Sequence, residues 1–407
     1  MDSTEREGLS PKGNVPNLRF PEFQGEWEKK SLGEIGDSFI GLTYRPTDVV
    51  SEGGLIVFRS SNIQNGCIDY KDIVRVNKNV KEKLITKKDD LLVCARNGSA
   101  RLIGKNAILH KTDANQTFGA FMMVFRSDKN HFVHQLLNTS RYSSQVSENL
   151  GARINQITSS DLSSFKFFFP KEKGEMNKIA ALLDLLDERI VIQSKIIEDL
   201  KKLKCAIIED LLNYREGGEV CLGDIGSFVR GLTYSSDDVV EESGTIVMRS
   251  NNIVNGCPLD YKNNLVYVNK PILSEQLLQS GDVVICMANG SSALVGKSSC
   301  YDGGCLLPIT IGAFCGVYRS NEPLAKWLFQ TSTYRRYIRK SLQGGNGAIA
   351  NLNSDDILRM SFEIPEVSTK KRFVKLLTST DSAIQNNSRL YDLYIAQKQY
   401  LLRQMFI

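Results

Sequence analysis

The sequence of 407 residues contains an internal duplication with an offset of about 190 residues. Residues 32–67 and 222–257 align without a gap, and 22 of these 36 positions are identical. After small insertions and deletions, TFGAFMMVFRS (117–127) matches TIGAFCGVYRS (310–320). The repeat is much longer than a solenoid unit of roughly 20 to 50 residues, so each copy is expected to fold as a domain with its own core.

Each copy has the pattern of short strands joined by turns. Equivalent runs such as IVFRS and IVMRS, LLVCA and VVICM, and FMMVF and CGVYR are rich in apolar and β-branched residues. Asn65-Gly66, Asn97-Gly98 and their copies predict hairpin turns, whose central positions favour positive φ. Helical stretches (131–149 and 322–343) follow, and a short strand ending in Pro170 or Pro365 closes each domain.

A long helix with a heptad pattern follows each copy, over about 176–213 and 370–406. Eight of the ten seam positions in the first helix are apolar; the ten are Ile179, Leu183, Leu186, Ile190, Gln193, Ile197, Leu200, Lys204, Ile207 and Leu211. The second helix repeats this seam 194 residues later with more polar residues. Globular helices of about 38 residues are rare, so we expect the two to pair; the alternative is that each lies on its own domain.

The geometry of such a pair predicts the architecture. A 38-residue helix is roughly 57 Å long at about 1.5 Å per residue, so antiparallel pairing would put the domains at opposite ends of a rod, related by an approximate twofold axis. Gln193 and Asn387 lie near the helix centres and are expected to meet there and fix the register. The predicted fold class is α+β: two similar mixed α/β domains separated by a pair of long antiparallel coiled-coil helices. The expected boundaries are a flexible segment 1–14, domains 15–170 and 217–365, and long helices 171–216 and 366–407.

Composition limits the possible environments and partners. The formal net charge is only +5, so a nucleic-acid surface must be a local patch, and the 42% of apolar residues suffice for two cores. Nine scattered cysteines without CxxC pairs predict a reduced, cytoplasmic protein. No apolar run reaches about 18 residues, which excludes a membrane span, and the polar N-terminus argues against secretion.

Catalytic and metal-binding motifs are weak. His131 and His134 share a helix face, but no cluster of further ligands accompanies them, so no metal site is expected. Residues 290–298 resemble a phosphate-binding loop but have five intervening residues rather than four, and the copy ends in Asn106, which lacks the Mg²⁺-binding hydroxyl. We expect a strand and turn there. Neither an Asn-Pro-Pro-Tyr methyltransferase motif nor a Gly-rich cofactor loop is found, so no catalytic residue and no bound cofactor are predicted.

Three motifs occur in both copies: Leu-Gly-x-Ile-Gly, Gly-x-Thr followed by Arg-Ser-x-Asn-Ile, and an aspartate-led apolar strand with Gly-Lys about fifteen residues later. With the opening NLRFPEFQGEWEKKSLGEIG and the final LLRQMFI, they resemble the specificity (S or HsdS) subunits of type I restriction-modification systems over nearly the whole chain. Thr43-Tyr44 and Thr233-Tyr234 depart from the Gly-x-Thr-Pro that this family often has.

The resemblance implies a division of labour. The specificity subunit reads double-stranded DNA, two methyltransferase (M) subunits dock on its helices and methylate adenine N6, and restriction/translocase (R) subunits join for cleavage. S-adenosylmethionine and ATP are then expected on these partners. Two related domains on one duplex predict related half-sites on opposite strands, separated by an unread gap.

Candidate DNA-binding residues combine donor side chains with turn positions. They form four groups: Arg59, Ser60, Asn62 and Asn65 with their copies Arg249, Ser250, Asn252 and Asn255; Arg96, Asn97, Ser99 and Lys105 with Asn289, Ser291 and Lys297; Thr43, Tyr44 and Arg45 with Thr233 and Tyr234; and Arg335, Arg336, Arg339 and Lys340. The alternative for the first group is a turn cap, and for the last a solvated face. Positions that differ between the copies, such as Arg45 and Ser235 or Arg96 and Ala288, are expected to read different bases.

Two other classes of function remain open at this point. A duplicated non-catalytic module that binds protein or carbohydrate would also explain the repeats, but it predicts no salt-dependent affinity for DNA. A free-standing enzyme would require the loop at 290–298 to bind nucleotide, and substitution of Lys297 would then abolish its activity.

Overall fold

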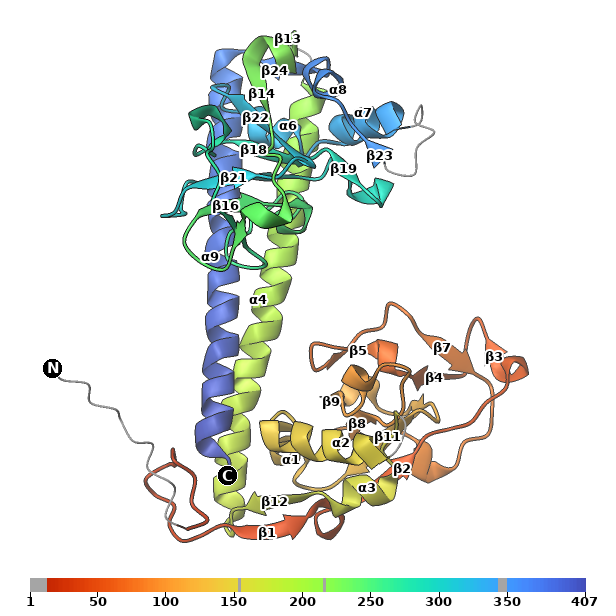
Figure 1. Cartoon of the computed structure of the whole chain (residues 1–407). Helices are drawn as coiled ribbons and strands as arrows, with labels where there is room; N and C mark the ends of the chain where they lie inside the picture. The colour runs from red at the N-terminus through yellow and green to blue at the C-terminus, as the bar shows by residue number, and fades with distance from the viewer. Residues whose placement is uncertain (1–12, 153–154, 215–216, 343–349) are drawn as a thin grey trace, which may run out of the picture. The chain divides into compact units, whose positions relative to one another are not determined.

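The computed structural model describes residues 13–152, 155–214, 217–342 and 350–407. The predicted N-terminal segment 1–14 lies almost wholly outside this range. The chain forms two compact units, Met1–Lys195 with Ser388–Ile407, and Ile196–Asn387 (Figure 1). Each unit therefore contains one domain and part of each long helix. No described helix is long and apolar enough to cross a membrane.

The domain of the first unit is built on two four-stranded sheets, with strand orders β2-β11-β8-β9 and β10-β4-β7-β3. Strands β1 and β12 pair at the domain's start and end, and β5 and β6 form a hairpin. The strands are β1 (Glu28–Ser31), β2 (Asp37–Ile40), β3 (Val49–Val50), β4 (Leu55–Phe58), β5 (Ile63–Gln64), β6 (Cys67–Ile68), β7 (Val74–Val76), β8 (Leu91–Cys94), β9 (Asn106–Ile108), β10 (Thr117–Phe118), β11 (Met122–Arg126) and β12 (Lys166–Phe169). The helices are α1 (Asn130–Leu136), α2 (Ser140–Ala152), α3 (Ser159–Ser164) and α4 (Lys173–Asn213).

The domain of the second unit repeats this topology, with sheets β14-β22-β18-β20 and β21-β16-β17-β15 and the closing pair β13-β24. Its strands are β13 (Gly217–Cys221), β14 (Gly226–Arg230), β15 (Val239–Val240), β16 (Thr245–Met248), β17 (Val266–Val268), β18 (Val283–Cys286), β19 (Ala288–Asn289), β20 (Ser298–Cys300), β21 (Ile309–Ile311), β22 (Cys315–Ser320), β23 (Ala350–Asn351) and β24 (Ser361–Pro365). Its helices are α5 (Leu222–Ile225), α6 (Ala325–Leu328), α7 (Ser332–Leu342), α8 (Ser354–Leu358) and α9 (Val367–Met405). The equivalent sheets confirm two similar domains.

The central strands are apolar on both faces because each face is buried against a different cluster. In β11, Met123 and Phe125 pack with the helices, whereas Met122 and Val124 face the second sheet. The strand is therefore a continuous apolar run rather than an alternating one. A buried carboxylate begins the neighbouring strand: Asp90 accepts two hydrogen bonds from the Arg126 guanidinium, at 2.7 and 2.6 Å, and the pair Asp282–Arg319 repeats this contact.

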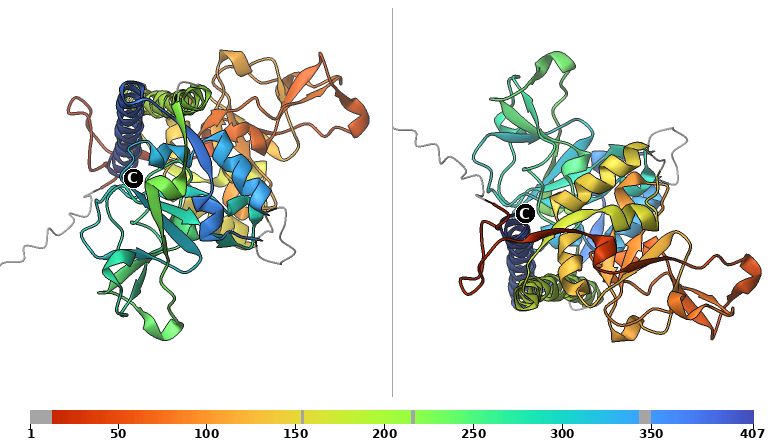
Figure 2. Two further views of the ribbon diagram at one scale, coloured as in Figure 1. Left: turned by 90° about the horizontal axis from the view of Figure 1, so that it is seen from above. Right: turned by 90° about the horizontal axis from the view of Figure 1, so that it is seen from below.

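The long helices α4 and α9 pack against each other in antiparallel directions, as predicted, and lie side by side in both views of Figure 2. In the first unit, Lys398 Nζ lies 2.5 Å from Asp187 Oδ1; in the second, Lys204 Nζ lies 2.6 Å from Asp381 Oδ1. These are repeat-equivalent residues, 194 positions apart, so the two ion pairs are reciprocal. Only an antiparallel arrangement gives both contacts.

The register role of Gln193 and Asn387 stays a prediction, because the two residues belong to different compact units. Gln193 is buried. The Asn387 side chain donates to the carbonyl of Ala383, one turn earlier, at 2.7 Å.

Two local predictions were wrong. The helical stretches predicted at 131–149 and 322–343 are each broken into two helices. The first helix ends at Leu136 or Leu328, and the next begins at residue 140 or 332. The break occurs because the Thr139 and Thr331 hydroxyls donate to the carbonyls of Leu136 and Leu328. The Asn97-Gly98 hairpin turn does not form either: neither residue has positive φ, and the Asn97 side chain instead accepts a hydrogen bond from the Ser99 amide.

The Asn65-Gly66 turn does form. Both residues have positive φ, 51° and 76°, and they join β5 to β6. In the second copy, Gly256 has a positive φ of 72°, whereas Asn255 does not have a positive φ.

Candidate nucleic-acid interface

Loops from four parts of the first domain are joined at the C-terminal ends of β4, β8 and β10. The Leu42 amide donates to the Phe118 carbonyl at 2.7 Å, and the Gly119 amide donates to the Phe58 carbonyl at 3.0 Å. The Phe121 carbonyl accepts the amides of both Ala95 and Arg96, at 2.9 and 3.0 Å. We define loop cluster 1 as residues 41–45, 59–61, 96–99, 119–121 and 155–156.

Glycine allows two of these loops to approach each other closely. A Cβ atom on Gly41 would lie 2.2 Å from the carbonyl oxygen of Gly119, and one on Gly231 would lie 2.1 Å from that of Gly312. No side chain fits at such distances, and the obstructing atom is backbone. The glycine that begins the shared Gly-Leu-Thr-Tyr motif is thus explained by loop packing.

Polar side chains connect the rest of loop cluster 1. The Asn97 side-chain amide donates to Ser60 Oγ at 3.0 Å, and its oxygen accepts the Ser99 amide at 3.0 Å. Asn155 donates to the Gly98 carbonyl at 3.2 Å, and Gln156 forms a β-bridge with Arg96. The structure thus brings together residues from two of the predicted groups, Ser60 from the first and Arg96, Asn97 and Ser99 from the second.

The second domain builds the same arrangement from the equivalent residues. Leu232 donates to Ile311, Gly312 donates to Met248, and the Phe314 carbonyl accepts the amides of Met287 and Ala288. The Asn289 side chain donates to Ser250 Oγ at 3.3 Å and accepts the Ser291 amide at 3.0 Å. We define loop cluster 2 as residues 231–235, 249–251, 288–291, 312–314 and 350–351.

Asn62 and Asn252 close turns inside their domains. Both are buried, and each side-chain oxygen accepts the amide of the preceding arginine, Arg59 or Arg249, at 2.9 or 3.0 Å. Each side-chain amide donates to two carbonyls of the following loop. The structure therefore favours the turn-cap alternative for these two asparagines.

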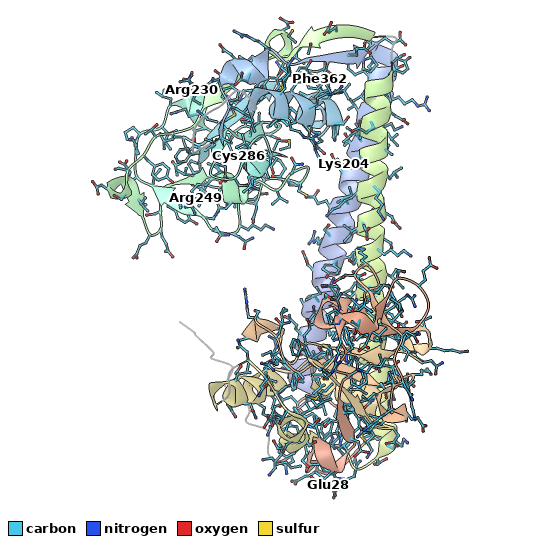
Figure 3. All side chains as sticks on the ribbon, turned by 90° about the vertical axis from the view of Figure 1, so that its right-hand side faces the viewer. Glu28, Lys204, Arg230, Arg249, Cys286 and Phe362 are labelled. Carbon is cyan, nitrogen blue, oxygen red and sulfur yellow. The ribbon has the colours of Figure 1, made fainter. Side chains whose placement is uncertain are left out.

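The arginines at these turns have different partners. Arg59 forms an ion pair with Asp72 at 2.8 Å, so its guanidinium is already engaged. Arg249 is exposed and donates to the Asn264 carbonyl at 3.2 Å. Figure 3 marks Arg249 on its domain, together with Cys286 in the sheet and Lys204 on α4.

The loops of Thr43 and Thr233 are held by lysines that sequence analysis missed. Lys78 Nζ donates to the Thr43 carbonyl at 3.1 Å, and Lys270 Nζ donates to the Thr233 carbonyl at 2.9 Å. Thr43, Thr233 and Arg45 are exposed, whereas Tyr44 and Tyr234 are half-buried against small apolar clusters.

Four other predicted residues lie outside the loop clusters. Asn65 lies in the β5–β6 turn, and Asn255 accepts the Ser298 amide at 3.2 Å. Lys105 and Lys297 are half-buried where β9 and β20 begin, and their backbones pair with Cys94 and Cys286.

Helix α7 presents the basic residues. Arg335, Arg336, Arg339 and Lys340 are exposed, while Tyr334 and Ile338 on the opposite side are buried. The Tyr334 hydroxyl donates to the carbonyl of Gly296, which fixes the helix against the loop that follows residues 288–291 of loop cluster 2. The aligned positions in α2 are Ser143, Ser144, Ser147 and Glu148, so the four cations belong to the second domain alone.

Two exposed aromatic residues, Phe121 and Phe314, are not among the residues predicted from the sequence. Their side chains are 59% and 67% exposed, although each lies in an apolar run that predicts core. The available signal was their identity in the two copies of Gly-Ala-Phe.

Thiols and histidines in the domains have structural roles. Burial raises the pKa of the Cys94 thiol to about 11 and that of Cys315 to about 12, which opposes a nucleophilic role. His131 and His134 have different partners: Asp184 raises the pKa of His131 by hydrogen bonding, whereas burial lowers that of His134 to about 4. Among the described residues no group of three or more His, Cys, Asp or Glu could hold a metal ion. Residues 290–298 form a turn leading into β20, as predicted, rather than into a helix that could bind phosphate.

Comparisons with known proteins agree with this architecture. The family described as "Type I restriction modification DNA specificity domain" matches residues 24–202. The EcoKI specificity subunit of Escherichia coli K12 is 27% identical over 198 residues, which cover 46% of this chain and 42% of the relative's length. The StySPI specificity subunit of Salmonella potsdam is 23% identical over 383 residues, 86% of this chain and 81% of the relative.

A solved structure shows the same fold. The S subunit of a type I restriction-modification system from M. genitalium superposes with a TM-score of 0.64 at 17% identity, covering 97% of this chain and 99% of that one. The duplicated domains, the paired helices and these matches make the chain similar to the specificity subunits of type I restriction-modification systems.

Proposed function

We propose that this chain is the DNA sequence-specificity subunit of a type I restriction-modification complex and binds a bipartite site in double-stranded DNA. The observation that carries the proposal is that both domains present equivalent loop clusters, in which equivalent hydrogen bonds hold the side-chain donors. The chain itself is non-catalytic. Its site of action is the cytoplasm, where the DNA lies.

Within this proposal, the residues that differ between the loop clusters read different bases. Exposed Arg96 in loop cluster 1 corresponds to Ala288 in loop cluster 2, and exposed Arg45 corresponds to Ser235. Arginine donates two hydrogen bonds to guanine in the major groove, which alanine and serine cannot do in that way. The two half-sites are therefore expected to differ in sequence.

Phosphate contacts come mainly from the second domain. The exposed cations of α7 are Arg335, Arg336, Arg339 and Lys340. None of them forms an ion pair with another described residue, which leaves their charge for a polyanion. Such contacts position a protein on DNA without reading its sequence. They also make the affinity depend steeply on salt.

The paired helices are proposed to dock two methyltransferase subunits, with restriction/translocase subunits joining for cleavage. S-adenosylmethionine and ATP are then bound by these partners. In the first unit Leu185, Ile192 and Leu393 are exposed on the helices, and in the second unit Leu203 and Leu376 are. Exposed apolar side chains of this kind are typical of protein interfaces.

Mapping of methylated adenines tests the proposal. A host carrying this chain with its methyltransferase subunits should show one motif of two short half-sites separated by an unread gap. A continuous motif, or no motif that depends on this chain, contradicts the proposal. The rival function, binding of protein or carbohydrate, would be favoured if the purified complex had no salt-dependent affinity for a duplex containing the mapped motif.

A further inference from the structure

Phe121 and Phe314 are exposed on turns that are held rigidly. The Met122 amide donates to the Gly119 carbonyl at 2.8 Å, which closes the turn, and the Phe121 carbonyl accepts two further amides. The second domain repeats these contacts through Gly312, Phe314 and Cys315, and each distance differs from its equivalent by at most 0.2 Å. The backbone that carries each ring is therefore already ordered before any partner binds.

Among the described residues, Phe121 and Phe314 are the two phenylalanines with exposed side chains. The neighbouring residues Met122 and Cys315 are buried in their sheets, whereas the phenylalanines point away from them into solvent. Folding alone does not explain why both copies keep a phenyl ring there, because exposed apolar surface contributes nothing to the core. Both rings belong to loop clusters otherwise lined by polar donor groups.

Building on the proposed function, we propose that Phe121 and Phe314 each press a phenyl ring against the bases of one DNA half-site. DNA offers apolar surfaces at the thymine methyl group and at the faces of the bases, and phenylalanine is among the side chains that proteins insert between base steps. The polar residues beside each ring supply the hydrogen bonds that a groove requires. A protein interface would instead favour a depletion of such polar groups around the aromatic residue.

The rings differ in role from their neighbours. Because phenylalanine occupies both copies, it contributes affinity at both half-sites and does not distinguish between them. The Arg96 guanidinium lies 5.3 Å from the centre of the Phe121 ring, whereas Ala288 takes the arginine's place near Phe314. The ring is the common anchor, and the residue beside it discriminates.

The test uses the full chain assembled with its methyltransferase subunits and a duplex containing the mapped site. We expect F121A and F314A each to weaken binding of this duplex by about tenfold, within the range known for base–aromatic contacts. Affinity for an unrelated duplex and the salt dependence should stay unchanged, since no charge is removed. The mapped methylation motif should also stay the same, and F121W should restore affinity.

Three further measurements make the result decisive. 2-Aminopurine in the half-site should brighten on binding of the wild type and less with F121A, because a pressed ring unstacks bases. L306A is the matched control: Leu306 is fully exposed outside the loop clusters, and its loss should not change binding. If F121A and F314A bound the mapped duplex with wild-type affinity, the inference about the rings would be wrong while the proposed function would stand. If these variants lost their methyltransferase subunits, the inference would also be wrong, because the rings would then belong to a protein interface. If the wild type showed no preference for the mapped duplex, the proposed function would be wrong as well.

Discussion

The ion pair between Lys204 and Asp381 offers a quantitative test of the helix pair. Lys204 is a seam residue of α4, 8% exposed, and its ammonium group also donates to the Gly256 carbonyl at 3.0 Å. The second carboxylate oxygen of Asp381 accepts the Trp327 indole N–H at 2.9 Å. The lysine thus connects α4, α9 and the second domain, and K204M removes its charge while keeping an apolar stem of similar length.

The expected loss lies between two limits. Breaking a fully buried ion pair costs about 3 to 5 kcal/mol, whereas exposed pairs contribute about 0 to 1 kcal/mol. Asp381 is about one-third exposed and keeps Trp327 as a partner, so its carboxylate is only partly stranded. We therefore expect K204M to lower the free energy of unfolding by about 2 kcal/mol. For a unit of this size that corresponds to a melting temperature lower by about 4 to 8 °C.

Calorimetry of the full chain measures this loss, with K202M as the matched control. Lys202 pairs with Glu198 and Asp199 on the same helix, but all three side chains are exposed, so K202M should leave the melting temperature unchanged. The double variant K204M/D381N should lose less than the sum of its single variants, because the two residues interact directly. Equal melting temperatures for K204M and K202M would refute the reasoning.

Three other outcomes are expected. Replacing Arg335, Arg336 and Arg339 by serine should reduce the slope of log affinity against log salt by about 3, measured by anisotropy on duplex DNA; an unchanged slope would place these residues off the DNA. His134 is neutral in the fold, with its pKa lowered to about 4 by burial, so stability should fall as the pH drops from about 6.5 toward 4, by at most ~3 kcal/mol. Urea unfolding between pH 7 and 5 should show the part of this fall that lies above pH 5 in the wild type, and a smaller fall in H134Q. R96A should alter one half-site of the methylation motif and leave the other intact, and a motif changed in both halves would contradict the assignment of one domain to each half-site.

The duplication made most of the fold predictable. Equivalent residues in two copies indicated which segments share a structure, and the predicted strands around Val57, Val93 and Val124 are β4, β8 and β11. The long helices were also recognisable, because the heptad period depends only on residues near in sequence. The breaks at Thr139 and Thr331 were not, since a threonine inside an apolar pattern is compatible with a continuous helix.

The loop clusters were harder to predict because distant backbone contacts assemble them. Asn97 meets Ser60 across 37 positions of sequence, and neither residue's local pattern indicates the other. Asn62 has the same composition signal as Asn97, a polar residue after a strand, yet its amide is buried inside a turn. Phe121 shows the converse case, since an apolar run predicted burial and only the folded turn reveals its exposure.

The first unit draws part of its core from residues far along the chain. Leu402, Met405 and Phe406 pack with Trp27 and Phe132, and the Leu18 amide donates to the Gln404 carbonyl. During synthesis the ribosome must first translate residues 196–387, which at about 5 to 20 residues per second takes roughly 10 to 40 s. For that interval the nascent first domain exposes an unfinished apolar surface, so chaperones have most to protect in the half of the protein that is made first.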